Sequence, residues 1–275
     1  MSPKKITFHK RLPRIRATKR EYDETVAKMA ELGPFYHNIY LKGIQTTGVH
    51  DHPLPIWDKL HPHLPADIID KKCLDIGCNS GFYSLILAKG GAEVLGIDNN
   101  QAGIDVVAQA EWLESEFQTG AKFEETSIMD LSASHKNTYD MVLCLGVYHH
   151  LPDTDSVLQK INQVMKKDAM LLFGSATNRY GPSEYYAEDS AEFANDPTCY
   201  RIATPEDILE DLADNGFTLI EEVWVDTSVF YGVFKKTKTT RKKTSRFTTE
   251  KIAEMVAAKK KVTKASKSSK KKSKK

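Results

Sequence analysis

The chain has 275 residues, of which 40% are hydrophobic and 28% charged, so it is long enough to bury one sizeable core as a globular protein. No apolar run approaches the roughly 20 residues that span a bilayer, and the first 20 residues lack the apolar segment of a secretory signal. Those residues contain arginine and no acid, so a mitochondrial targeting segment stays open. The four cysteines show no metal-type spacing, which favours reduced thiols and a cytoplasmic location.

Charge is distributed unevenly along the chain. Residues 1–20 carry a net charge of +8 and residues 235–275 carry +16, whereas the part between them carries −22. The Lys- and Ser-rich end cannot bury enough apolar surface to fold, so we expect a basic arm over 1–20 and a mostly disordered tail over 236–275. Two basic arms favour binding of a polyanion such as RNA, while the alternative is a solvated charge run.

Strands and helices are expected to alternate through the acidic part. Five segments are typical of strands: 73–76, 92–98, 122–130, 139–146 and 169–175. Helical spacing of apolar residues predicts helices at 82–91, 101–117 and 156–165. This alternation predicts a Rossmann-like α/β fold, with a doubly wound and mostly parallel sheet.

The last structured part is expected to close the sheet. Thr204 is placed as a helix N-cap, with Pro205 at the first helical position and Gly216 at the end. Two consecutive strands, at 217–226 and 228–236, then predict a C-terminal antiparallel hairpin. Together these segments give a seven-stranded sheet.

The turn after the first strand carries the main functional signal. It has the pattern Asp75-x-Gly77-x-x-x-Gly81, with one glycine fewer than the dinucleotide fingerprint and an acid inside the strand. A pyrophosphate gains nothing from a nearby carboxylate, whereas a cofactor with a cationic amino-acid end does. S-adenosylmethionine is such a cofactor. Over residues 70–235 the chain resembles the class I S-adenosylmethionine-dependent methyltransferases.

The resemblance implies a cofactor site at the ends of successive strands. Gly77 and Gly81 would let the turn approach the methionine part, and Asp75 would attend its ammonium. Asp98 would accept both ribose hydroxyls, and Asp130, at the end of the third strand, would receive the adenine amino group. Any one of these acids could instead be a helix N-cap. The cofactor-binding residues expected are Asp75, Gly77, Cys78, Gly81, Asp98, Asn99, Ile128, Met129, Asp130 and Gly146.

The segment GVYHHLPD follows the fourth strand and is expected beside the transferred methyl group. Methyl transfer needs an aligned nucleophile and, where that nucleophile is protonated, a base. Tyr148, His149 and His150 are the catalytic candidates, with His149 favoured for the pocket and His150 for support. No Asn/Asp-Pro-Pro-Tyr/Phe motif is present, which argues against an exocyclic base amine as the target. An oxygen or carbon nucleophile is expected.

The segment GPFYHNIYLKGIQTTG at 33–48 resembles part of a narrower group of methyltransferase-like proteins. The glycine turn at 77–81 and the pair His149 and His150 share this resemblance. That group includes the enzyme that carboxymethylates wobble hydroxyuridine in tRNA. The resemblance implies that residues 21–69 form a helical cap over the cofactor, with His37 toward the substrate. It also implies that Tyr148 would recognise a carboxylated cofactor, although ordinary S-adenosylmethionine is preferred here.

Two further groups of side chains are candidates for a binding site. The segment 178–203 follows the fifth strand, where substrate lids are often inserted. Its aromatic and arginine residues would clamp a planar or anionic substrate, or serve as pins of a long loop: Arg179, Tyr180, Tyr185 and Arg201. The histidines at 50–52 and 61–63 lack companion ligands at familiar spacing, so we expect no metal site.

Three functions stay open at this point. The preferred one is transfer of a methyl group from S-adenosylmethionine to a small-molecule acceptor by direct in-line displacement. The second is a tRNA- or RNA-modifying methyltransferase or carboxymethyltransferase held on its substrate by the basic arms. The third is a catalytically silent protein of the same fold that binds nucleic acid.

Overall fold

The computed structural model describes residues 11–46, 48–50, 53–100, 104–186, 196, 198–224 and 228–237. The first ten residues of the predicted basic arm lie outside this described part. The predicted disordered tail lies outside it too, apart from its first two residues.

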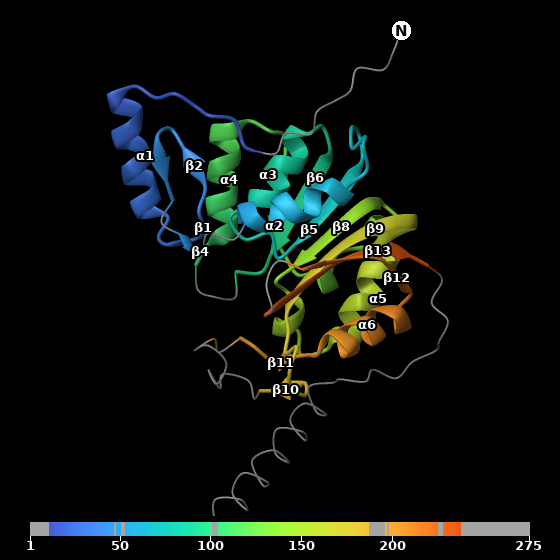
Figure 1. The fold of residues 1–275 in the computed structure, drawn as a ribbon. Helices are drawn as coiled ribbons and strands as arrows, with labels where there is room; N and C mark the ends of the chain where they lie inside the picture. Colours follow the sequence, from blue (N-terminus) through green and yellow to red (C-terminus); the bar gives the residue numbers. More distant parts are fainter. Residues whose placement is uncertain are drawn as a thin grey trace, which may run out of the picture.

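A seven-stranded sheet forms the centre of the molecule (Figure 1). The strand order is β12-β13-β9-β8-β5-β6-β7. The five strands from β9 to β7 in this order run parallel to one another. β13 is antiparallel to both of its neighbours, β9 and β12. The predicted Rossmann-like sheet is therefore confirmed. The strands are β5 (Lys72–Ile76), β6 (Glu93–Asp98), β7 (Lys122–Glu125), β8 (Tyr139–Leu145), β9 (Met165–Ala176), β12 (Phe217–Trp224) and β13 (Val229–Lys236).

Helices cover both faces of this sheet because successive strand residues point to opposite sides. In β5, Cys73 packs into the core beneath one set of helices and Leu74 into the core beneath the other. Side chains cap three of the four helices at their first turns, through Asp105, Asp153 and Thr204. The helices are α3 (Phe82–Lys89), α4 (Val106–Phe117), α5 (Thr154–Val164) and α6 (Pro205–Asp214).

Two predicted strand boundaries are wrong, and the helix expected at 101–117 begins only at Val106, after the N-cap Asp105. The third strand ends at Glu125 instead of residue 130, because Ser127 caps a 3-10 turn, η2 (Ile128–Asp130), by accepting from the amide of Met129. The fifth strand begins at Met165, directly after α5, rather than at residue 169. A second 3-10 turn, η3 (Ala133–His135), precedes β8.

Residues 21–69 were expected to be a helical cap, but the N-terminal segment, residues 19–64, also contains four short strands. They form two pairs, parallel β1 (Phe35–His37) with β4 (Gly48–His50), and antiparallel β2 (Tyr40–Leu41) with β3 (Ile44–Gln45). Its helical elements are α1 (Lys19–Glu31), α2 (Pro53–Leu60) and the 3-10 turn η1 (His61–His63).

This N-terminal segment is attached to α4, beside which it lies in Figure 1. The side-chain amide of the buried Gln109 donates to the carbonyl oxygens of Leu32 and Pro34 at 3.1 and 3.0 Å. A half-buried ion pair joins Lys42 to Glu116 at 2.5 Å. The segment is therefore fixed to the sheet through α4.

All four cysteines are buried free thiols. Among the described residues, no helix is long and apolar enough to cross a membrane.

Candidate cofactor and catalytic site

The turn between β5 and α3 depends on two glycines with positive φ. Gly77 has a φ of +66°, and a Cβ there would lie 2.4 Å from Cγ2 of Val147. Gly81 has a φ of +82°, and a Cβ there would lie 2.7 Å from the ring of Phe123. The backbone amides of Gly77 and Cys78 both donate to the carbonyl of Ile97. Both glycines are thus required by the fold as well as by any approaching ligand.

Asp98, the last residue of β6, is held by the backbone on both oxygens. Its Oδ2 accepts from the amide of Asn79 at 3.0 Å, and its Oδ1 accepts from the amide of Asn100 at 3.1 Å. The side chain is half-buried, and each carboxylate oxygen retains a further lone pair. Asp98 is therefore an oriented acceptor with capacity for further hydrogen bonds, and its contact with the ribose hydroxyls stays a prediction. Asn99 beside it is exposed.

Asp75 lies inside the sheet and not on the open side of the turn. It is 2% exposed and accepts a hydrogen bond from Oγ of Ser84 at 2.7 Å. Burial raises the pKa of Asp75 to about 7, against the opposing effect of that hydrogen bond. The residue joins β5 to α3 directly behind the turn. Cys78 is also buried, and burial raises the pKa of its thiol well above the usual value.

The residues expected around the adenine are only partly placed as predicted. Ile128 is buried in the core, whereas Met129 is 46% exposed and Asp130 is exposed. Because β7 ends at Glu125, Asp130 closes the η2 turn and does not end a strand, which corrects that prediction. Glu125 is the residue in register with Asp98.

Gly146, directly after β8, has a φ of +79°, and a Cβ built on it meets nothing within 4 Å. Its amide donates to the carbonyl of Gly174 in β9. The glycine is therefore required by its backbone conformation, and the space beside it is open.

The two histidines of the 3-10 turn η4 (Tyr148–His150) lie in different environments, although their ring centroids are 4.0 Å apart. Nδ1 of His149 is 3.4 Å from Oγ of Ser175, and its carbonyl accepts from the amide of Tyr200. Burial, with repulsion from His150, lowers the pKa of His149 to about 3. His149 is therefore neutral over the physiological range.

His150 contacts the segment after β9. Its Nδ1 lies 2.8 Å from Oγ1 of Thr198 and 3.8 Å from Oδ2 of Asp196. Burial acts to raise the pKa of Asp196, but hydrogen bonds from Thr198 outweigh it, and the pKa is lower than usual. Asp196 is therefore an anion beside the imidazole.

The N-terminal segment reaches the same region through β1. The ring of His37 packs edge-on against Phe82 and Tyr83, with 6.4 and 6.1 Å between the ring centroids. These two residues lie in the first turn of α3, directly after Gly81. Burial raises the pKa of the adjacent Tyr36, and the negative charge of Asp196 adds to this effect. β1 and the segment after β9 thus approach each other near the glycine turn.

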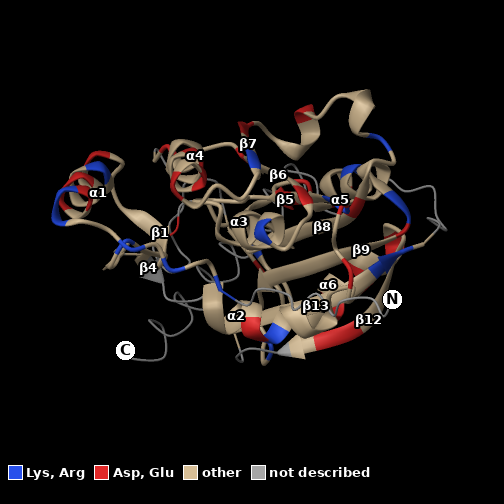
Figure 2. Ribbon diagram, turned by 90° about the horizontal axis from the view of Figure 1, so that it is seen from above, with Lys and Arg blue, Asp and Glu red and all other residues tan. Residues whose placement is uncertain are grey.

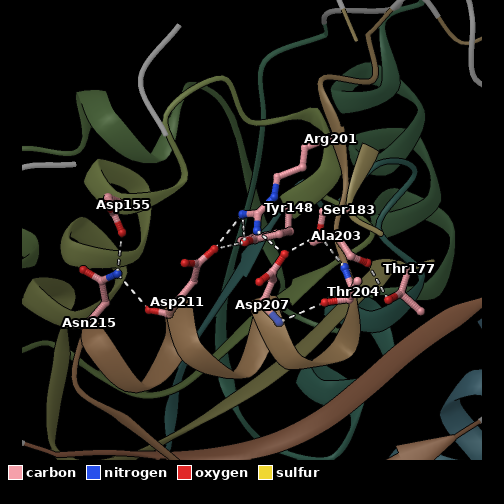
Figure 3. Close-up of polar contacts among 10 residues, drawn as sticks. All are labelled: Tyr148, Asp155, Thr177, Ser183, Arg201, Ala203, Thr204, Asp207, Asp211 and Asn215. Carbon is pink, nitrogen blue, oxygen red and sulfur yellow. Dashed lines mark hydrogen bonds and ion pairs between the residues drawn. The ribbon is translucent and has the colours of Figure 1, made fainter. Parts of the chain in front are cut away.

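Tyr148 and Arg201 belong to a buried hydrogen-bond network with Asp211, as Figure 3 shows. Both are fully buried, and Nη1 of Arg201 donates to the Tyr148 hydroxyl at 2.7 Å and to Oδ2 of Asp211 at 2.6 Å. The Tyr148 hydroxyl donates to the same carboxylate oxygen at 2.5 Å. This geometry favours a structural role for both residues over contact with substrate.

The other substrate candidates separate as well. Tyr185 of β10 (Glu184–Tyr185) is buried, and the guanidinium of Arg201, in β11 (Arg201–Ile202), lies over its ring at 5.6 Å. Arg179 and Tyr180 are exposed in the turn after β9, Tyr180 by 84%. Of the two alternatives for this segment, the buried positions of Tyr185 and Arg201 favour pins of a long loop over a substrate clamp.

Several residues of the site were not predicted. The backbone amides of Asn79 and Asn100 orient Asp98, and both residues have positive φ, which asparagine tolerates better than most residues. Thr198 and Asp196 lie 48 and 46 residues after His150, and no local spacing relates them to it.

A model of the methyltransferase domain family matches residues 69–274, which is more than half of the chain, so this protein belongs to that family. The expected membership is thereby confirmed. A ubiquinone biosynthesis O-methyltransferase of Pseudomonas syringae pv. tomato is 33% identical over 128 residues, 46% of this chain and 53% of that protein. The chain spans about half the length of the curated relatives it matches. The narrower resemblance to the tRNA enzyme stays a prediction.

Two solved structures show the same fold. An S-adenosylmethionine dependent methyltransferase from Mesorhizobium loti has a TM-score of 0.54 at 14% identity, over 66% of this chain and 98% of that one. The 1,6-didemethyltoxoflavin-N1-methyltransferase of Burkholderia thailandensis, solved with bound 1,6-didemethyltoxoflavin and S-adenosylhomocysteine, has a TM-score of 0.54 at 19% identity, over 82% of this chain and 92% of that one.

Proposed function

We propose that this protein transfers a methyl group from S-adenosylmethionine to a hydroxyl oxygen of a small-molecule acceptor. One observation carries the proposal. The turn from Gly77 to Gly81 and the carboxylate of Asp98, fixed by two backbone amides, lie at the carboxyl edge of adjacent strands, where ligands of such sheets bind. The names of the relatives support the same chemistry.

The side chains of this edge fit the cofactor. Asp98 would accept the two ribose hydroxyls, and the exposed face of Met129 would cover the adenine. The open space beside Gly146 leaves room for the amino-acid end of the cofactor. The ammonium group of that end would donate a hydrogen bond to the Gly146 carbonyl. When bound, the cofactor supplies a methyl group that is already activated by its sulfonium charge. The chain has only to orient the acceptor, exclude water and remove a proton.

The histidine pair supports a hydroxyl as the acceptor group. A neutral hydroxyl must lose its proton during transfer, and a positioned imidazole is the usual base for this. RNA is a weaker candidate, since along the described ribbon the Lys and Arg positions alternate with Asp and Glu positions (Figure 2).

The proposal is tested by calorimetric titration of S-adenosylhomocysteine into the full chain, followed by assays of methyl transfer by mass spectrometry. Dihydroxybenzoates serve as hydroxylated probe acceptors, with bulk tRNA in parallel. Saturable cofactor binding and a product heavier by one methyl group on the probe support the proposal. Absence of cofactor binding overturns it, and transfer to tRNA alone would redirect the activity to RNA.

A further inference from the structure

We propose that His150 is the base that removes the acceptor's proton, and that Thr198 and Asp196 are positioning residues that keep its Nε2 unprotonated. This inference rests on the proposed function and names the group that carries its proton transfer. It reverses the order expected from the sequence, in which His149 was favoured.

The direction of the hydrogen bonds fixes the tautomer of His150. Oγ1 of Thr198 lies 2.6 Å from Oδ1 of Asp196, and an ionised carboxylate can only accept, so the threonine proton points to Asp196. Oγ1 must then accept from Nδ1 of His150 at 2.8 Å. The carbonyl of Thr198, at 3.2 Å from the same Nδ1, also can only accept. Nδ1 therefore carries the proton, and Nε2 carries the lone pair.

Within the described part of the chain, Nε2 of His150 has no hydrogen-bond partner, so it is available to an acceptor hydroxyl. The acceptor oxygen bonds to the methyl carbon as the bond from that carbon to sulfur breaks, and the hydroxyl proton passes to Nε2. The imidazolium formed keeps its Nδ1–H bond to Thr198. The negative charge of Asp196, 3.8 Å away, stabilises it.

His149 is a poor base in the same turn. Oγ of Ser175 lies 3.4 Å from its Nδ1 and donates to the carbonyl of Ala176. The negative charge of Asp196 also favours a proton on His149, but burial and repulsion from His150 outweigh it and lower the pKa of His149 to about 3. A base with so low a pKa is a weak proton acceptor, so it would contribute little to removal of the acceptor's proton near neutral pH.

Residues 198–201, which include Thr198, are held against η4 by hydrogen bonds. The amide of Tyr200 donates to the carbonyl of His149, and its own carbonyl accepts from the amide of Tyr186. Two residues beyond Cys199, which is buried, Arg201 is anchored on Asp211 and Tyr148. Thr198 therefore has a fixed location relative to His150. Tyr36, whose pKa responds to Asp196, approaches the same carboxylate from the N-terminal segment.

The test is a nitrogen-15 NMR measurement of histidine tautomers in the full chain without cofactor, with the His150 signal assigned by its loss in His150→Gln. We expect Nδ1–H in the parent protein and a reduced Nδ1–H fraction in Thr198→Val, because free histidine prefers the other tautomer. Thr198→Ser keeps the hydroxyl and should restore it. Thr218→Val, the same change at an exposed position of β12, is the matched control.

An Nε2–H tautomer in the parent protein overturns the inference. So does a tautomer ratio that stays unchanged in Thr198→Val. Where methyl transfer to a probe is found, His150→Gln should lower kcat about 100-fold and His149→Gln less than about 10-fold. Thr198→Val should lower kcat with little change in KM. Since the tautomer is read without cofactor, failure of this inference is separable from failure of S-adenosylhomocysteine to bind.

Discussion

Asp75 in β5 accepts a hydrogen bond of 2.7 Å from Ser84 in α3, and both side chains are buried behind the glycine turn. The pair joins the first strand of the parallel sheet to the helix that follows the turn. It also places a titratable group where solvent cannot stabilise its charge.

The first prediction concerns the pH dependence of stability. The folded-state pKa of Asp75 is raised from 3.8 to about 7, so the folded protein binds more protons than the unfolded chain between these values. Its contribution to the free energy of unfolding is therefore largest below pH 4 and falls as pH rises to about 7. Asp75→Asn should gain stability relative to the parent over this window, by at most about 4 kcal/mol. Urea unfolding at pH 4 and pH 8 measures it, and an equal difference at both pH values would contradict it.

The second prediction concerns the cofactor. Asp98→Asn keeps the shape of the side chain but removes its charge, and should weaken binding of S-adenosylhomocysteine about 10- to 100-fold. Glu125→Gln is the control, because Glu125 is in register with Asp98 at the end of the neighbouring strand and is exposed. Calorimetry on both variants decides the matter. Equal affinities would remove Asp98 from the site.

The third prediction separates backbone strain from steric clash at two glycines. Gly77→Ala and Gly146→Ala both place a side chain at positive φ. Only at Gly77 would the new Cβ clash with a neighbour, because it would lie 2.4 Å from Cγ2 of Val147. Gly146→Ala should cost about 1 kcal/mol, and Gly77→Ala about 1–3 kcal/mol more. Urea midpoints give both values. A similar loss for the two would mean that Val147 moves aside freely.

The fourth prediction concerns the buried pair of Arg201 and Asp211. Arg201→Met leaves a carboxylate buried without its cation, and should destabilise the protein by about 3–5 kcal/mol. The double variant Arg201→Met with Asp211→Leu removes both charges and should recover much of that loss. Chemical unfolding of the parent and of the single and double variants forms a thermodynamic cycle. A double variant less stable than Arg201→Met would contradict the prediction, because removal of the second charge would then cost further stability.

The parts of the site that depend on local pattern were predictable from the sequence. Gly77, Gly81 and Asp98 each follow or end a strand, and their place at the carboxyl edge results from the strand–helix alternation alone. Asp130 was misplaced because Ser127 ends the strand early by capping a turn, a local competition that β-propensity does not express.

The remaining features required tertiary structure. Nothing in the sequence distinguishes a buried Arg201 from an exposed Arg179, since the difference lies in Asp211 and Tyr148, which reach Arg201 from α6 and η4. The same is true of Thr198, whose contact with His150 forms only when the segment after β9 folds back on η4.

The attachment of the N-terminal segment to α4 has a consequence for the order of folding. Gln109 reaches carbonyl oxygens 77 and 75 residues earlier in the chain, so this contact closes a long loop and carries its entropy cost. We expect the sheet and α4 to assemble first and the segment with His37 to dock late. A nascent chain would then have its glycine turn formed before His37 of β1 packs against Phe82 and Tyr83 at the start of α3, so completion of this region would lag behind formation of the sheet.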